Sequence, residues 1–327
     1  MAYRGQPDGL RFGADATFAG DNKRSGAMIS YWWMPTNAEK DVEEKDIDDK
    51  NIEEDDEEAE NENSEKSNEK KDKKKSSKKI GVYIFNEDGD TIRNYTIKPD
   101  SGFNRTYWNL RANGVNFPSY SSPIKDADKP SGNKVKPGKY KIILVKDDFK
   151  DSTSVTVKPD PRVPFSAEAY NQKEKLNNQL QGYTKAAFDL VTNLNDASKR
   201  IGMVNQNIEL LEDSIQAKIK KQGKTCQDSI NKYYLFFMTA KDFEGYDHVT
   251  VRINNLLGSA GEYINWPTDY PGPQAEIALK NVERELQKAA KSINKFFEAN
   301  WKNYQDLVKQ SEPKLFKEYK PVKLSDD

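Results

Sequence analysis

The stretch that decides the fold of this chain runs from Ile80 to Ile97 and has the sequence IGVYIFNEDGDTIRNYTI. Two short runs rich in β-branched and aromatic residues stand on either side of Asn86–Asp90, in which Asp88-Gly89 supplies the positive φ angles of a tight turn. We therefore expect Ile80–Phe85 and Thr91–Ile97 to pair as an antiparallel hairpin.

Similar runs lie on both sides of this hairpin, and turn signals at Pro137-Gly138 and Asp147-Asp148 separate some of them. They are Gly26–Met34, Asn104–Leu110, Gly138–Val145 and Ser152–Val157. Five to seven short strands within about 130 residues are typical of a small antiparallel sandwich.

A helical period replaces the strand pattern after Pro159-Asp160-Pro161-Arg162, and Ser166 is a suitable N-cap. Four main amphipathic helices with short connections predict an up-and-down bundle. Gly223 is expected to separate the second helix from the third, although one bent helix is also compatible with the pattern. Residues 247–257 are expected to add a shorter helix, and Pro267, Pro271 and Pro273 precede the last long one. The apolar positions that carry the period begin with Leu176, Leu180, Tyr183, Ala187, Leu190 and Leu194, continue from Ile201 to Ile215 and from Cys226 to Ala240, and end with Ile277 to Leu307.

Charge is segregated along the 327 residues, although the net charge is only -1. Residues 39–65 hold 16 acidic residues against 3 Lys, and residues 66–79 hold 8 Lys against 2 acidic residues. This tract has too few apolar residues to offset its ordering entropy, so we interpret it as a disordered insertion. The expected division is an N-terminal segment with the first strand (1–37), the insertion (38–79), the sandwich (80–162), the bundle (163–312) and a tail (313–327).

Composition and motifs argue against several classes of function. One Cys and one His cannot form an internal disulfide or a Cys/His zinc cage, and His248 and Cys226 have no surrounding catalytic motif. No phosphate-binding glycine loop and no strong basic field for nucleic acid are present outside the tract. No apolar run is long enough to span a membrane, and the first residues, MAYRGQPDGL, lack the pattern of a signal peptide. We therefore predict no cofactor, no nucleic-acid partner and no membrane-spanning segment.

The acidic half of the tract offers one metal alternative, a weak Ca²⁺ site without the spacing of an EF-hand. Its candidate ligands are Asp41, Asp46, Asp48, Asp49, Asp55 and Asp56.

Aromatic residues are the more informative candidates for binding. Tyr31, Trp32 and Trp33 lie on one expected strand, and Tyr107 and Trp108 lie on another. Neighbouring residues of a strand point to opposite faces, so one of Trp32 and Trp33 should enter the core and the other should face outward. The outward residue would be available to a protein or a glycan, or would pack against another domain.

Several short motifs stand in a fixed order within residues 10–165. They are Arg11-Phe12-Gly13, Phe18–Asn22, Gly26–Trp32, Val82–Phe85, Gly102–Arg105, Trp108–Arg111, Pro137–Tyr140 and Lys158–Arg162. This order resembles the segment that follows the propeller in bacterial sortilin-like (VPS10-type, BNR-repeat) proteins labelled glycosyl hydrolases. The resemblance implies an Ig-like, FlgD-type module followed by a helical bundle, and an overall α+β, multidomain fold.

The same resemblance implies a location and a role. It suggests a secreted, cell-surface or periplasmic protein of a bacterium, with the Bacteroidota as the expected group. The chain has none of the propeller repeats and no catalytic residue that matches the family, so we expect a non-catalytic interaction module that docks to a propeller or outer-membrane protein. The alternative is a glycan-acting hydrolase or an accessory carbohydrate-binding subunit.

Overall fold

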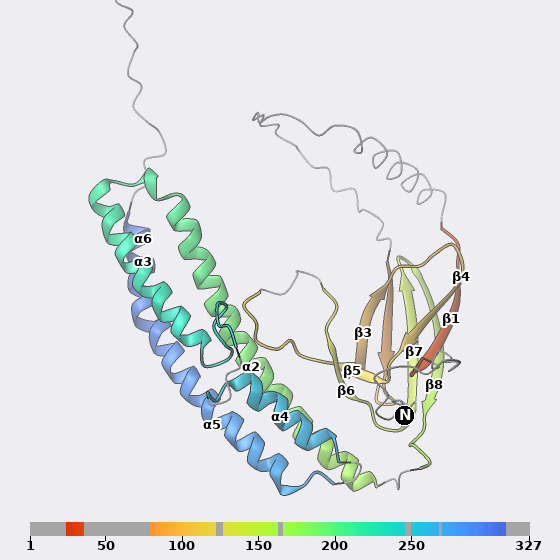
Figure 1. The fold of residues 1–327 in the computed structure, drawn as a ribbon. Helices are drawn as coiled ribbons and strands as arrows, with labels where there is room; N and C mark the ends of the chain where they lie inside the picture. Colours follow the sequence, from red (N-terminus) through yellow and green to blue (C-terminus); the bar gives the residue numbers. More distant parts are fainter. Residues whose placement is uncertain are drawn as a thin grey trace, which may run out of the picture. The chain divides into compact units, whose positions relative to one another are not determined.

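The computed structural model describes residues 24–35, 79–121, 127–162, 166–245, 250–267 and 270–311, and it has a mixed α+β fold with antiparallel sheets (Figure 1). The chain forms two compact units. The sheet unit comprises residues 1–113 and 128–163, and the helical unit comprises residues 114–127 and 164–327. Most of the charged tract, His248 and the six aspartates considered for Ca²⁺ lie outside the described residues.

The sheet unit is built around a four-stranded antiparallel sheet with the order β3-β2-β7-β8. Its strands are β2 (Ile80–Phe85), β3 (Thr91–Ile97), β7 (Gly138–Lys146) and β8 (Phe149–Val157). The expected β2–β3 hairpin is present with both strands at their predicted bounds. The expected pair of positive φ angles was wrong, because only Gly89 of the turn has one, at 87°. Asn86 closes the turn instead, since its side-chain oxygen accepts a hydrogen bond from the Asp90 amide at 2.7 Å.

Two further strands, β1 (Ala27–Trp33) and β4 (Gly102–Trp108), pair with each other as a two-stranded ribbon. The ribbon shares its core with the four-stranded sheet, because Ile29 and Trp108 pack in one buried cluster with residues of β2 and β7. Gly26, directly before β1, allows the chain to pass close to Trp108 at the start of the ribbon. Its φ is +119°, and a side chain at this position would bring a Cβ within 2.3 Å of the Trp108 carbonyl oxygen.

The sequence missed one small pair of strands, β5 (Arg111–Asn113) and β6 (Ser131–Lys134). Both are short and contain mainly polar residues, so they lack the alternation that predicts a strand. They are tied to β3 by side chains, since the Asn94 amide donates to the Asn113 side-chain oxygen at 3.2 Å and the Arg93 guanidinium donates to the Pro130 carbonyl at 2.5 Å.

The helical unit begins with α2 (Ala167–Gln206), whose predicted N-cap is confirmed because the Ser166 hydroxyl accepts a hydrogen bond from the Ala169 amide at 3.2 Å. The apolar repeat from Ile201 to Ile215 is not a separate helix. It covers the end of α2, the short η1 (Ile208–Leu210) and the start of α3 (Asp213–Tyr234).

Gly223 does not separate two helices, as expected from the sequence, but lies buried within α3. A Cβ at this position would lie 3.3 Å from the ring of Tyr304, so the glycine permits close approach of the neighbouring helix. The helix expected near residues 247–257 is α4 (Ile253–Asn265).

The last long helical stretch starts at Pro273, as the prolines predicted. It is α5 (Pro273–Phe296), which continues through η2 (Phe297–Trp301) into α6 (Lys302–Gln310), as Figure 1 shows. One continuous buried cluster links α2 to α6. Among the helices in the described ranges, none has the length and apolar character needed to cross a bilayer.

The chain between β5 and β6 packs on the helical unit, although the sequence placed it within the sandwich. The Tyr120 ring makes an edge contact with the Tyr234 ring at 4.9 Å, and its hydroxyl donates to the Thr239 carbonyl at 2.8 Å. The amides of Asn195 and Asn254 donate to the carbonyls of Ser119 and Pro118, each at 3.0 Å. Residues 118–120 are therefore held by three helices, α2, α3 and the later helix that contains Asn254, and by the chain that follows α3.

Two buried tyrosines of the helical unit allow a matched stability test. The Tyr234 hydroxyl donates to Asn195 at 2.7 Å, whereas the Tyr304 hydroxyl has no hydrogen-bond partner among the described residues. We expect Tyr234→Phe to lower the free energy of unfolding by about 1 kcal/mol, because it removes a hydrogen bond and leaves a partner unpaired. Tyr304→Phe should be neutral or slightly stabilising. Urea unfolding followed by circular dichroism measures both, and an equal loss in the two variants would contradict the expectation.

The same tyrosines predict loss of stability in alkali. Burial raises the pKa of Tyr234 and of Tyr304 to about 12, because it disfavours the phenolate. The stability that this shift provides is present below the ordinary tyrosine pKa near 10 and is lost as the pH rises through 12. We expect the melting temperature to decrease as the pH is raised from 10 to 12. The decrease should be smaller in the Tyr234→Phe/Tyr304→Phe double variant. Thermal melts across this pH range measure the difference.

Candidate interaction surface

The side chains on the outer side of the β1–β4 ribbon form the candidate site. Antiparallel pairing sets Met28 opposite Tyr107, Ser30 opposite Arg105, and Trp32 opposite Phe103, and cross-strand partners share a face. Met34 follows directly after β1 with the same alternation. We call this set the aromatic face, defined by Met28, Ser30, Trp32, Met34, Phe103, Arg105 and Tyr107.

Four large apolar side chains of the aromatic face are more than half exposed. The exposed fraction is 68% for Trp32, 59% for Phe103, 57% for Met34 and 54% for Met28. Single exposed apolar residues are normal on a protein, but several on one face of one ribbon form a patch. Such patches mark surfaces that bind other molecules.

Arginines flank the rings of this patch. The Arg105 guanidinium carbon lies 5.2 Å from the centroid of Phe103, and that of Arg24 lies 5.5 Å from the centroid of Tyr107. These distances allow cation–π contacts, which hold the planar guanidinium groups beside the exposed ring of Phe103 and the half-buried ring of Tyr107. Aromatic residues, Met and Arg are the residue types enriched at protein interfaces.

The opposite side of β1 faces the four-stranded sheet. Ile29 is buried and Tyr31 and Trp33 are half-buried, so Trp32 and Trp33 lie on opposite faces as alternation requires. Burial, with a smaller effect of Asp100, raises the pKa of Tyr31. The ammonium nitrogen of Lys146 lies 5.6 Å from the centroid of the Trp33 ring, and it also pairs with Asp147 at 3.1 Å.

The five aromatic residues singled out from the sequence thus separate into three groups. Trp32 and Tyr107 belong to the aromatic face, while Tyr31 and Trp33 face inward. Trp108 is 1% exposed, and its indole nitrogen donates to the Arg111 carbonyl at 3.0 Å. Trp108 is therefore a core residue and does not contribute to an exposed surface.

Sequence reasoning missed Met28, Met34, Phe103 and Arg105. Phe103 was lost because the strand was expected to start at Asn104, whereas β4 begins at Gly102. The others become visible as a patch only when the register of β1 against β4 is known. A hairpin signal between the two strands would have given that register, but the whole charged tract and the β2–β3 hairpin separate them in the sequence.

A groove of about 640 Å³ lies between the inner side of β1 and strands β7 and β8. Its lining includes Ile29, Tyr31 and Trp33 from β1, Leu144 from β7 and Phe149 from β8. Asp151 is the carboxylate among its lining residues, and its oxygen accepts a hydrogen bond from the Ser152 amide. The groove therefore offers apolar surface and strand edges rather than an acid–base pair.

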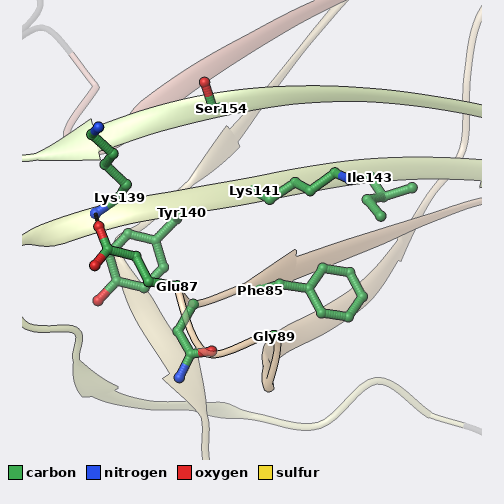
Figure 2. Close-up of a pocket in the computed structure, with 9 residues that line it drawn as sticks. Phe85, Glu87, Gly89, Lys139, Tyr140, Lys141, Ile143 and Ser154 are labelled. Atoms are coloured by element: carbon green, nitrogen blue, oxygen red, sulfur yellow. Dashed lines mark hydrogen bonds between the residues drawn. The ribbon is translucent and has the colours of Figure 1, made fainter.

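A second depression, of about 460 Å³, lies beside the β2–β3 turn (Figure 2). Figure 2 shows Glu87 next to Lys139 and Tyr140, with Phe85 and Lys141 further along the sheet. Glu87 is engaged, because its carboxylate accepts a hydrogen bond from the Lys139 amide at 3.2 Å. This depression also has a single carboxylate in its lining, whereas glycoside hydrolysis generally needs two.

Cys226 is buried, and burial raises the pKa of its thiol, which disfavours the nucleophilic thiolate. No group of three or more His, Cys, Asp or Glu side chains within the described ranges is placed to hold a metal ion. His248 and the aspartates considered for Ca²⁺ are outside them.

Comparisons with protein-family models, with curated proteins and with solved structures find no match for this chain. The resemblance to sortilin-like proteins therefore stays a prediction that rests on the order of the quoted motifs.

The division of the aromatic residues predicts opposite effects of two tryptophan substitutions. Trp32→Ala should change the free energy of unfolding by no more than about 0.5 kcal/mol, because the side chain is largely exposed. Trp108→Ala should lower it by about 3–5 kcal/mol, because it leaves a cavity in the core. Chemical unfolding of both variants checks this, and a large cost for Trp32→Ala would show that its ring is needed for folding.

Proposed function

We propose that this chain is a non-catalytic interaction module and that its sheet unit docks a protein partner through the aromatic face. The observation that carries the proposal is the row formed by Met28, Trp32, Met34 and Phe103, all more than half exposed and flanked by arginines. Interfaces concentrate their binding energy in such aromatic and Arg anchors.

Within this proposal the sheet unit is an Ig-like sandwich and the helical unit is an antiparallel bundle that acts as a rigid platform. The paired β1–β4 ribbon over a four-stranded sheet supports the first assignment. The shared core of α2 to α6 supports the second. A rigid scaffold that presents an exposed patch suits binding because little entropy is lost when the partner docks.

The partner that we propose is a propeller-bearing or outer-membrane protein of a bacterial envelope. The order of motifs that resembles sortilin-like proteins supports this choice, since those modules follow a propeller. The arginines of the aromatic face favour a partner surface with carboxylates around an apolar centre.

A glycan is the second candidate ligand for the same face. Trp32 and Phe103 are direct cross-strand neighbours with exposed rings, and such rings offer apolar surface to the faces of sugars. A hydrolase has weaker support, because each described depression presents one carboxylate in its lining.

Site-specific photo-cross-linking tests the proposal. A photoreactive residue at Ser30, in the middle of the aromatic face, should cross-link one partner in native bacterial envelopes. A photoreactive residue at Ser152, exposed on β8, should not. Binding of the purified partner should weaken at least 30-fold with the Trp32→Ala/Phe103→Ala variant, the loss expected when hot-spot residues are removed.

The matched control is Tyr83→Ala, which removes a partly exposed aromatic ring from β2 and should leave the affinity unchanged. Equal cross-linking from Ser30 and Ser152, or equal affinity of all variants, would argue against the aromatic face. Binding of a glycan array that disappears in Trp32→Ala/Phe103→Ala would select the second candidate instead.

A further inference from the structure

Residues 118–120 lie on the helical unit in the way that a bound peptide lies on its receptor. They belong to that unit, although they stand between β5 and β6 in the sequence. Two main-chain carbonyls, those of Pro118 and Ser119, each accept a hydrogen bond from an asparagine side-chain amide at 3.0 Å. Main-chain hydrogen bonds give affinity in peptide recognition, whereas side-chain pockets give specificity. These two hydrogen bonds therefore use groups that any peptide offers.

The specific contact of this segment is the side chain of Tyr120. Its ring meets the edge of the Tyr234 ring at a centroid distance of 4.9 Å, and its hydroxyl donates to the Thr239 carbonyl at 2.8 Å. The ammonium nitrogen of Lys241 lies 4.9 Å from the centroid of the Tyr120 ring, which allows a cation–π contact. We call the groups that hold the segment the tyrosine slot, defined by Asn195, Tyr234, Thr239, Lys241 and Asn254.

Contacts within the helical unit hold the walls of the tyrosine slot without the segment. Tyr234 is part of the buried core of the helices, and its hydroxyl donates to the side-chain oxygen of Asn195 at 2.7 Å. The main-chain amide of Asn254 donates to the Phe237 carbonyl at 3.2 Å. Because none of these contacts involves residues 118–120, we expect the slot to keep its shape when the segment leaves it.

One buried atom of the tyrosine slot is not used by the segment. The side-chain oxygen of Asn254 has no hydrogen-bond partner within the described part of the chain, while the nitrogen of the same amide donates to Pro118. Pro118 cannot donate to this oxygen, because proline has no N–H. In an extended chain the N–H and C=O of one residue point to the same side, so an ordinary residue here would engage both atoms of the Asn254 amide. A buried acceptor without a partner costs free energy, which favours such a ligand over Pro118.

We propose that the tyrosine slot is a peptide-binding site, which residues 118–120 occupy as an intramolecular ligand. Its partner is a protein that presents an extended segment with a tyrosine two positions after a residue other than proline. Such a segment repeats the contacts of Ser119 and Tyr120 and adds the hydrogen bond that Pro118 cannot make. The chain's own segment is then an autoinhibitory contact that the partner displaces. The slot lies in the helical unit and the aromatic face in the sheet unit, so this proposal is independent of the proposed function.

Peptide binding to the full chain tests the slot. The Tyr120→Ala variant removes the anchor of the intramolecular ligand and should free the slot. The labelled probes are the peptide GVNFPSYS, which is the sequence of residues 114–121, and the peptide GVNFASYS, in which alanine replaces the proline. Fluorescence anisotropy should show that the alanine peptide binds the variant about fivefold more tightly than the proline peptide, because it makes one more hydrogen bond. Both should bind the unmodified chain about tenfold more weakly, because its own segment competes at a high local concentration.

A further substitution locates the bound peptide. Adding Asn254→Ala to Tyr120→Ala should remove the preference for the alanine peptide. Equal affinity of the two peptides for Tyr120→Ala, equal affinity of the variant and the unmodified chain, or no binding at all would overturn the proposal. Tighter binding of the proline peptide would overturn it as well, and would assign the slot to the same segment of a second copy.

Amide exchange in the full chain provides a second measurement that needs no peptide. Pro118→Ala introduces one main-chain amide, which should donate to the free side-chain oxygen of Asn254. Nuclear magnetic resonance should show that this amide exchanges about tenfold more slowly than the same amide in Pro118→Ala/Asn254→Ala. Equal exchange rates in the two variants would contradict the proposed recognition.

Discussion

The sheet unit depends on the burial of Trp108 between the ribbon and the four-stranded sheet. The Trp108 ring meets the edge of Tyr140 at a centroid distance of 5.1 Å, and its indole nitrogen donates to the Arg111 carbonyl. The Tyr140 hydroxyl in turn donates to the Lys136 carbonyl at 2.8 Å. These contacts satisfy the polar atoms of two large rings within an apolar core, and thereby fix β4 over β7. An isolated two-stranded ribbon is only marginally stable. The position of β1 therefore depends on its pairing with β4, which Trp108 anchors to the sheet.

The helical unit depends on a comparable arrangement around Asn195. Its side chain accepts a hydrogen bond from the Tyr234 hydroxyl and donates one to the Ser119 carbonyl. One polar side chain of α2 therefore joins α3 to the chain between β5 and β6. Because residues 114–127 belong to the helical unit while β5 and β6 belong to the sheet unit, the chain passes from one unit to the other three times. Separate folding of the two units would have to accommodate these connections.

The sequence predicted the features that arise from local interactions. The β2–β3 hairpin, the Ser166 N-cap and the start of α5 at Pro273 each depend on residues within one turn or one strand pair. Gly223 was wrongly predicted to end a helix. The glycine instead allows close contact with Tyr304, which is about 80 residues away in the chain. The docking of Tyr120 was missed for the same reason, since Thr239 is 119 residues distant. The aromatic face was predicted only in part, because its members come from two strands whose register no local signal sets.

The aromatic face has more large apolar side chains than folding of the ribbon requires. Burial against the four-stranded sheet uses only the inner residues of the ribbon, among them Ile29 and Trp108. The outer positions need only residues that suit a strand, and Thr or Arg would serve this purpose with less exposed apolar surface. Large apolar residues at Met28, Trp32 and Phe103 instead raise the risk of association between copies. Neither the core nor solubility explains these side chains, and the proposed binding role rests on them.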